Sequence, residues 1–172
     1  MHVQYPELYF TTASILGWKS LLFDDALKDI IINSFRFLVR EKRCAIYAFV
    51  IMPNHIHVVW SIEEPYTLSQ VQAALTSFTA HAFQKKLRTE TPNILEMFRV
   101  DKSDRAYQFW QREPKSIAIV NEQMFYRAVN YVHRNPVAKR WILAPTPEMY
   151  KYSSGYNNTY PGYWDFLSEF WG

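Results

Sequence analysis

The chain has 172 residues, a formal net charge of +3 and a sequence pI near 8.9. Its hydrophobic content of 49% and aromatic content of 17% exclude an intrinsically disordered protein, and the length favours a single domain over residues 1–172. The lone Cys44 excludes an internal disulfide and a cysteine-based zinc site. The longest apolar run, Cys44–Met52, is too short to cross a bilayer, and we find no secretory signal, so we expect a cytoplasmic protein without a membrane partner.

The first part of the chain predicts a strand followed by a helix. Tyr5–Thr12 is rich in β-prone residues and predicts the first strand, and Gly17 marks a turn after it. Asp24 or Asp25 suits the N-cap of a helix that we expect to end near residues 41–43. Its apolar residues recur at helical spacing, at Leu27, Ile30, Ile31, Phe35, Leu38 and Val39.

A β-hairpin is predicted next. Cys44–Ile51 is a continuous β-branched and aromatic run, which is typical of a strand buried on both faces. Pro53 and Asn54 interrupt this run, and His55–Ile62 resumes it. We therefore expect two strands joined by a tight turn, with the histidines at the start of the second strand.

The second half of the chain predicts two more helices and one more strand. Thr67–Leu87 has helical periodicity, and residues 89–104 are expected to form a mobile connection. Residues 106–111 have strand character. Residues 121–135 form the clearest late helix, which should stop or kink before Pro136.

The order of these elements favours an α+β fold, in which helices pack on an antiparallel sheet. From about residue 141 the chain becomes a tail rich in Tyr, Trp and Pro. We expect the aromatic side chains of this tail to pack back on the domain.

The predicted hairpin carries a possible metal-binding pair. Residues two apart on a strand point to the same face, so His55 and His57 can offer nitrogens to one ion while Ile56 enters the core. Without context, such a pair serves packing or hydrogen bonding more often than metal binding. Further ligands must come from elsewhere in the chain.

The last helix offers two complementary residues. Tyr131 lies off the apolar stripe and Asn135 follows four residues later, so both project from the same flank. Tyr131 could attack a phosphorus atom while the amide oxygen of Asn135 joins the metal. Two other histidines are interpreted differently: His81 as a surface or packing residue, and His133 as a surface or DNA-backbone contact.

Basic residues cluster in the second half of the chain, interleaved with aromatic residues. Single-stranded nucleic acid is bound by this combination, through phosphate neutralisation and base stacking, although solvated helix faces explain many such runs. The basic candidates for DNA binding are Lys85, Lys86, Arg88, Arg112, Arg134, Lys139 and Arg140. The interleaved rings are Phe98, Tyr107, Phe109, Trp110 and Trp141, of which Trp110 is the candidate DNA contact.

Two motifs together resemble those of the HUH single-tyrosine transposases, most closely the REP-associated tyrosine transposases of bacteria. The first is Met52-Pro53-Asn54 followed by His55-Ile56-His57, and the second is the segment from Tyr131 to Asn135-Pro136-Val137. The resemblance covers most of the chain, since comparable residues also stand at Gly17-Trp18 to Leu22-Phe23, Phe109-Trp110-Gln111-Arg112 and Tyr152-Ser153-Ser154.

This resemblance implies a ferredoxin-like or RRM-like core and a transposase that cleaves and joins single-stranded DNA at hairpins such as REP-like palindromes. On that analogy His55, His57 and Asn135 bind a divalent ion, magnesium or manganese, and Tyr131 is the nucleophile. Attack would leave a 5′-phosphotyrosine bond and a free 3′-hydroxyl. Both a monomer and a homodimer are compatible with the resemblance.

Two alternative functions remain open at this stage. A domesticated, non-catalytic protein could still bind DNA hairpins. A nucleotide hydrolase of the histidine-triad kind would also carry alternating histidines on a strand, but Val59 stands where the third histidine is expected.

Overall fold

The computed structural model describes residues 6–170. Its main sheet has four antiparallel strands in the order β2-β3-β1-β6. These strands are β1 (Leu8–Ser14), β2 (Cys44–Met52), β3 (His55–Ile62) and β6 (Lys115–Ile119). The longer helices are α1 (Asp25–Arg40), α2 (Leu68–Glu90) and α4 (Glu122–Arg134).

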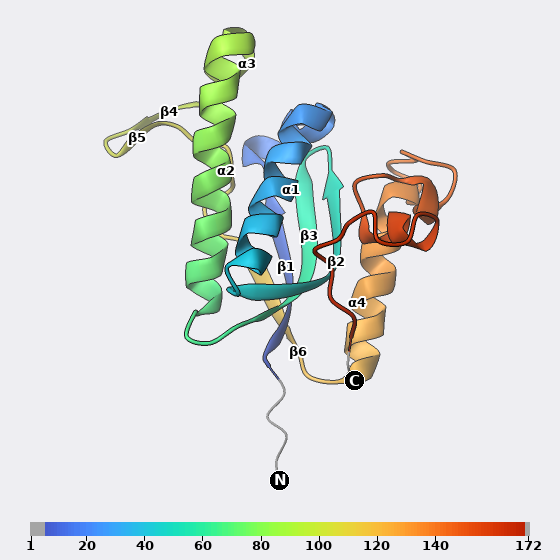
Figure 1. Cartoon of the computed structure of the whole chain (residues 1–172). Helices are drawn as coiled ribbons and strands as arrows, with labels where there is room; N and C mark the ends of the chain where they lie inside the picture. The colour runs from blue at the N-terminus through green and yellow to red at the C-terminus, as the bar shows by residue number, and fades with distance from the viewer. Residues whose placement is uncertain (1–5, 171–172) are drawn as a thin grey trace.

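Helices cover both faces of this sheet. Figure 1 shows α1 and α2 side by side on one face and α4 beside β2 on the other side. On the α1–α2 face Phe35 packs edge-on against Phe49, with ring centroids 5.6 Å apart. On the opposite face Phe10 of β1 meets Tyr131 of α4 at 5.8 Å. This four-stranded antiparallel sheet with helices confirms the predicted α+β class, and its strand order is ferredoxin-like.

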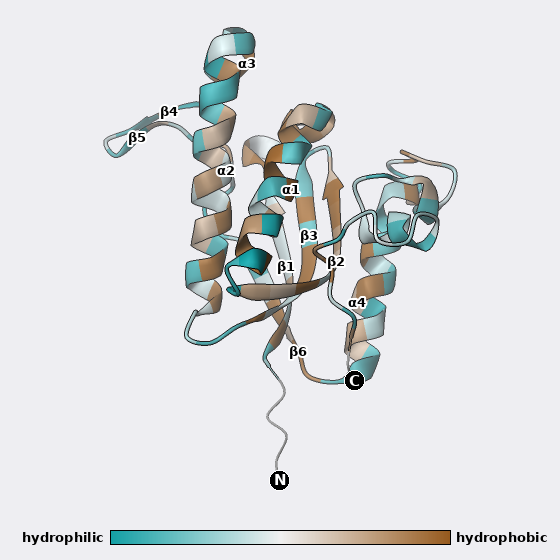
Figure 2. Cartoon of the chain, in the orientation of Figure 1, coloured by the Kyte–Doolittle hydropathy of each residue, from teal (hydrophilic) through white to brown (hydrophobic). Residues whose placement is uncertain are grey.

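The β2–β3 hairpin is largely buried, as predicted from its continuous apolar run. Figure 2 shows hydrophobic residues along β2 and β3, and the side chains of β2 from Ala48 onward are fully buried. The hairpin turn falls at Pro53 and Asn54, as predicted, and pairs Met52 with His55. Because β3 lies between β2 and β1, both histidines start a central strand.

Helix boundaries also agree with the sequence signals. The Asp24 side chain accepts a hydrogen bond from the amide of Ala26 and caps α1, as expected. α4 ends at Arg134, and the chain continues as a 3-10 turn over Asn135–Val137 that contains Pro136. Four more 3-10 turns are Leu16–Trp18, Leu21–Phe23, Pro147–Met149 and Ser154–Asn158.

The region between α2 and α4 differs from the prediction. Residues 89–104, expected to form a mobile connection, contain the end of α2, the short helix α3 (Pro92–Glu96) and strand β4 (Arg99–Lys102). β4 pairs with β5 (Arg105–Tyr107) in a separate two-stranded ribbon, so the strand predicted over residues 106–111 is mostly wrong. The fourth strand of the main sheet is instead β6, an edge strand whose side chains are largely exposed.

The first strand begins later than predicted. Tyr5 lies outside the described residues, and β1 extends beyond Thr12 to Ser14. None of the helices within residues 6–170 is long and apolar enough to span a membrane.

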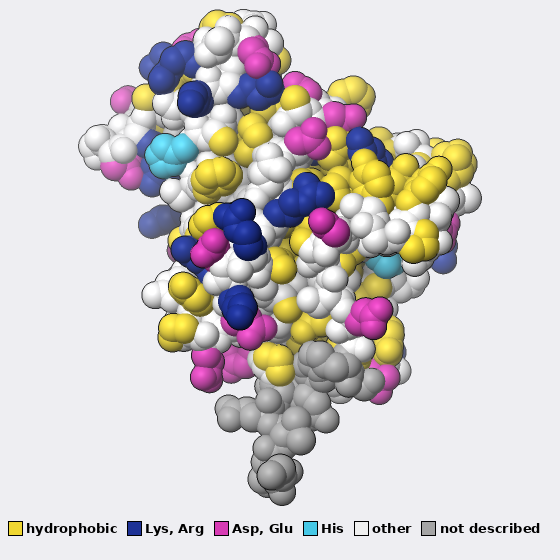
Figure 3. Space-filling model, in the orientation of Figure 1, with side chains coloured by type: hydrophobic (Ala, Val, Ile, Leu, Met, Phe, Trp, Pro, Cys, Tyr) yellow, Lys and Arg dark blue, Asp and Glu magenta, His cyan; other side chains and the backbone are white. Residues whose placement is uncertain are grey.

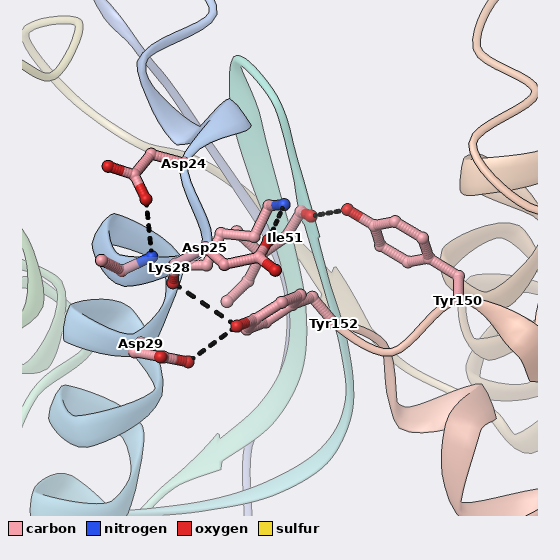
Figure 4. Close-up of polar contacts among 8 residues, drawn as sticks. Asp24, Asp25, Lys28, Asp29, Ile51, Tyr150 and Tyr152 are labelled. Atoms are coloured by element: carbon pink, nitrogen blue, oxygen red, sulfur yellow. Dashed lines mark hydrogen bonds and ion pairs between the residues drawn. The ribbon is translucent and has the colours of Figure 1, made fainter.

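The tail after residue 141 packs back on the domain, as expected. Its backbone covers the outer edge of β2, since the Ile51 amide donates to the Tyr152 carbonyl at 2.9 Å. Figure 4 shows two tail tyrosines reaching inward: Tyr150 donates to the Ile51 carbonyl at 2.7 Å, and Tyr152 donates to the Asp29 carboxylate at 2.8 Å. These contacts shield an edge that would otherwise be open to pairing.

Candidate active site

The two histidines share one face of β3, as the strand geometry predicted. The ring centroids of His55 and His57 are 4.7 Å apart, and the side chains are only 8% and 5% exposed. Both rings lie on the α4 side of the sheet, where His57 stacks on Phe10 at 5.2 Å. The pair is therefore held by a rigid central strand.

Each imidazole is oriented by a hydrogen bond at its Nδ1 atom. His55 Nδ1 lies 2.7 Å from Asn54 Oδ1, and His57 Nδ1 lies 2.8 Å from Thr12 Oγ1. Thr12 of β1 stands directly opposite His57 in the strand register. The sequence analysis predicted neither of these hydrogen bonds, although Asn54 directly precedes His55 in the sequence.

Burial keeps both imidazoles neutral. Desolvation lowers the pKa of His55 to about 4; the neighbouring Asn135 side chain opposes this shift, and the nearby Arg140 charge adds to it. Desolvation, with a smaller contribution from His55, lowers the pKa of His57 to about 3. A neutral imidazole keeps a nitrogen lone pair, which is the form that binds a metal ion.

Tyr131 faces this pair from α4. Its ring lies edge-on to His57 with centroids 5.3 Å apart, and its side chain is 53% exposed. Phe125 and Val132 bury the opposite flank of the helix, which leaves Tyr131 turned toward the cleft. The structure thus brings together the predicted tyrosine and histidines.

Asn135 completes the predicted set. Its Oδ1 atom and the Nε2 atom of His57 are both buried, and neither has a hydrogen-bond partner within the described residues. Buried polar atoms without partners are costly; a bound cation would satisfy the Asn135 oxygen and, when His57 carries its proton on Nδ1, the His57 nitrogen as well. The donor set of two imidazole nitrogens and an amide oxygen fits a divalent ion that completes its shell with water or phosphate oxygens.

Among residues 6–170, no carboxylate or thiol side chain lines this site. Residues 6–170 contain no cluster of three His, Cys, Asp or Glu side chains able to hold a metal. An ion at this position would therefore depend on the Asn135 amide as its third protein ligand.

A cleft of about 720 Å³ connects these residues. It also contains cationic and aromatic side chains suited to an anionic ligand with bases. Its lining comprises Thr12, Trp18, Asn54, His55, His57, Arg127, Asn130, Tyr131, Arg134, Asn135, Ala138, Arg140 and Trp141. Sequence analysis did not single out Arg127, Asn130 or Trp18 as site residues.

The predicted DNA-binding residues are distributed unevenly around this cleft. Arg134 and Arg140 line it, and Lys139 is exposed beside Arg140. Arg112 lines a separate groove between α2 and β5. Lys85, Lys86 and Arg88 lie near the C-terminal end of α2, where Lys86 pairs with Glu90. Figure 3 shows Lys and Arg side chains gathered at that end of the molecule.

Trp110 does not match its expected role. Its side chain is 5% exposed, its indole N–H donates to Thr79 at 2.9 Å, and its ring packs against Phe83. Phe98 and Phe109 are also buried. These rings belong to the core beneath α2, so they offer no free face to a nucleic-acid base.

His133 has a structural role and His81 is exposed. His133, expected at the surface or on DNA, is half-buried, and its Nε2 lies 2.6 Å from Ser154 Oγ, which itself contacts the Phe49 backbone of β2. His133 therefore links α4 to the tail by a hydrogen bond, so the predicted surface or DNA-backbone role is wrong. His81 is exposed and bonds the Ser77 carbonyl of its own helix, as one of the two interpretations predicted.

The fold and site define a class. A ferredoxin-like sheet with a His-x-His pair on a central strand, faced by a helical tyrosine, is the arrangement of HUH single-tyrosine transposases. The family model described as "Transposase IS200 like" matches residues 18–135. The chain belongs to this IS200-like transposase family.

Two solved structures share the fold. A REP-associated tyrosine transposase bound to a REP hairpin superposes with a TM-score of 0.66 at 18% identity, covering 98% of this chain and 92% of that one. A protein of Deinococcus radiodurans R1 named as a transposase gives a TM-score of 0.50 at 16% identity, covering 78% and 94%. No curated protein matches the sequence.

Proposed function

We propose that this protein is a metal-dependent endonuclease and strand transferase that cuts single-stranded DNA beside hairpins in the cytoplasm. The observation that carries the proposal is that Tyr131 shares one cleft with His57 Nε2 and Asn135 Oδ1, two buried atoms without a hydrogen-bond partner among residues 6–170. A tyrosine next to two imidazole nitrogens and an amide oxygen that could bind a cation suits phosphoryl transfer better than simple binding.

The proposed reaction is a transesterification. The phenolic oxygen of Tyr131 attacks the scissile phosphorus and loses its proton to solvent, a Tyr–O–P bond forms, and the P–O3′ bond breaks. The leaving 3′-oxygen takes up a proton and becomes a free hydroxyl, while the 5′ end stays attached to the enzyme. Attack of a 3′-hydroxyl on the phosphotyrosine reverses these steps and joins two DNA ends without ATP.

The protein's own residues position the reactants. The phenol of Tyr131 is exposed toward the cleft, so it can reach a phosphate that enters from solvent. Arg127, Arg134 and Arg140 line the same cleft and can neutralise the DNA backbone. His55, His57 and Asn135 would hold the divalent ion, magnesium or manganese, which supplies Lewis-acid polarisation of the phosphate.

A DNA hairpin is the partner that we propose. The structural relative bound to a REP hairpin shares the fold over nearly the whole chain, and the cleft offers cations together with the half-buried ring of Trp141. A cationic cleft with an aromatic platform suits single-stranded DNA that leaves a hairpin stem.

The test is cleavage of an oligonucleotide that carries a hairpin with a single-stranded flank, in the presence of Mn²⁺. We expect a covalent protein–DNA band that is lost in Tyr131→Phe. Tyr126→Phe is the matched control, because Tyr126 lies on the same helix and is equally exposed, at 53%. Hairpin binding without any covalent band, across several hairpin sequences, would instead indicate a domesticated binding protein.

A histidine-triad nucleotide hydrolase has less support. Val59 occupies the position of the third histidine and is fully buried. Release of a nucleotide from small substrates, without DNA cleavage, would favour that alternative over the transposase.

A further inference from the structure

We infer that Asn54 is a positioning residue: it holds His55 in the tautomer with hydrogen on Nδ1, so that the Nε2 lone pair is free for an ion in the cleft. This inference rests on the proposed function for its purpose, but its chemistry stands on the hydrogen bonds of the β2–β3 turn.

The contact between the two side chains has a definite direction. Asn54 is 5% exposed, and its Oδ1 atom lies 2.7 Å from His55 Nδ1. An amide oxygen only accepts hydrogen bonds, so the proton must reside on Nδ1 of the neutral ring. Nε2 then keeps its lone pair, which is the arrangement that a metal-ligating histidine requires.

The orientation of the Asn54 amide is fixed by a third group. Its Nδ2 atom donates to the backbone carbonyl of Trp18 at 3.4 Å. A reversed amide would set two oxygens against each other there and would place an N–H donor against the Nδ1 atom of His55. The chain of donors therefore runs one way, from His55 through Asn54 to the Trp18 carbonyl.

The backbone around Asn54 is also fixed by hydrogen bonds. The Ile15 amide donates to the Asn54 carbonyl, and the Leu22 amide donates to the Pro53 carbonyl, both at 2.9 Å. Between these two anchors the chain turns through left-handed conformations at Gly17 (φ 65°) and Trp18 (φ 55°). The Gly17-Trp18 turn thus places the Trp18 carbonyl where it accepts the hydrogen bond that orients Asn54.

The second histidine is held by a different kind of group. The Thr12 hydroxyl, 2.8 Å from His57 Nδ1, can either donate or accept, so it tolerates both tautomers. Asn54 accepts only. The structure therefore assigns control of the His55 tautomer to Asn54. Thr12 fixes only the orientation of the His57 ring.

The first experiment reads the tautomer directly, by two-bond ¹H–¹⁵N NMR of the full chain at pH 7.5 with EDTA. In the unmodified protein we expect a protonated Nδ1 and an unprotonated Nε2 at His55. Asn54→Ala should shift His55 toward the Nε2-protonated form, and Asn54→Asp, which keeps an acceptor, should restore the original pattern.

The second experiment measures Mn²⁺ affinity by calorimetry on the same proteins without DNA. Loss of an outer-shell partner weakens metal binding about 10- to 100-fold, so we expect that loss in Asn54→Ala and recovery in Asn54→Asp. Asn157→Ala is the matched control, since it removes an amide that bonds Trp164 in the tail, away from the cleft. Thermal unfolding verifies that every variant is folded.

The possible outcomes separate this inference from the proposed function. An Nε2-protonated His55 in the unmodified protein, or an unchanged tautomer and Mn²⁺ affinity in folded Asn54→Ala, would overturn the inference. A shifted tautomer and weaker Mn²⁺ binding in Asn54→Ala would support it, even if no Tyr131-dependent DNA cleavage were found and the proposed function failed.

Discussion

Tyr131 lies edge-on to His57 within one chain, with ring centroids 5.3 Å apart. The tyrosine comes from α4 and the histidine from β3, so the fold alone brings the two elements together on one face of the sheet. The candidate nucleophile and the candidate metal ligands therefore need no second subunit to meet.

A complementation experiment checks this arrangement. A mixture of Tyr131→Phe and His57→Ala proteins should remain inactive in hairpin DNA cleavage, because neither chain holds a complete site. Each variant alone should also be inactive, and the unmodified protein is the positive control. Recovery of cleavage in the mixture would show that the tyrosine of one chain works with the histidines of another.

Loss of the proposed metal ligands should separate binding from cleavage. His55→Ala and His57→Ala should abolish DNA cleavage and leave hairpin affinity largely intact, since phosphate contacts dominate affinity. EDTA should have the same effect on the unmodified protein, and added Mn²⁺ should reverse it. Electrophoretic mobility shift and cleavage assays check the two properties, and full activity in either variant or in EDTA would contradict the metal assignment.

The buried histidines should also make stability depend on pH. Their pKa values in the folded chain, about 4 and 3, lie below the ordinary value of 6.5. As the pH falls below 6.5, the unfolded chain binds protons that the folded chain excludes, so the free energy of unfolding decreases. Each histidine contributes a slope of at most about 1.4 kcal/mol per pH unit.

Urea denaturation in EDTA between pH 6.5 and 5 measures this slope. The double variant His55→Gln and His57→Gln should lose stability less steeply as the pH falls. Burial also lowers the pKa of His133, so part of the slope should persist in both proteins. Equal slopes in the two proteins would contradict the predicted burial of neutral imidazoles.

Arg140 should contribute to DNA affinity through charge. It is exposed at the cleft, and its guanidinium lies over the Trp141 ring at 5.7 Å. Arg140→Ala should weaken binding of single-stranded DNA and reduce the slope of log affinity against log salt by about 0.7. Arg99→Ala, which removes an arginine already paired with Glu96, should leave both quantities nearly unchanged. An unaltered salt slope in Arg140→Ala would place the DNA elsewhere.

Local sequence signals predicted the parts of the fold that have strong periodicity or clear boundaries. The β2–β3 hairpin, the Asp24 cap and the end of α4 before Pro136 follow from residue patterns that act over a few positions. β6 was missed because most of its side chains are exposed at a sheet edge, so it lacks the buried pattern that marks a strand. Its pairing with β1 is a long-range contact that no local pattern indicates.

The candidate site was only partly predictable from the sequence, because some of its contacts are also long-range. His55, His57, Tyr131 and Asn135 were predicted from residue chemistry and motif resemblance, and the structure places all four in one cleft. Thr12 reaches His57 through strand pairing, which spacing in the sequence cannot show. Trp110 was misjudged because aromatic residues among basic ones look the same in the sequence whether they are buried or exposed.

The most direct test is to locate the DNA attachment by mass spectrometry. The protein is incubated with a hairpin oligonucleotide and Mn²⁺, digested with protease and nuclease, and searched for a nucleotide-modified peptide. The account predicts a phosphodiester-linked nucleotide on Tyr131 and none on Tyr126. Cleavage of the DNA with attachment at another residue, or with no attachment at all, would contradict it.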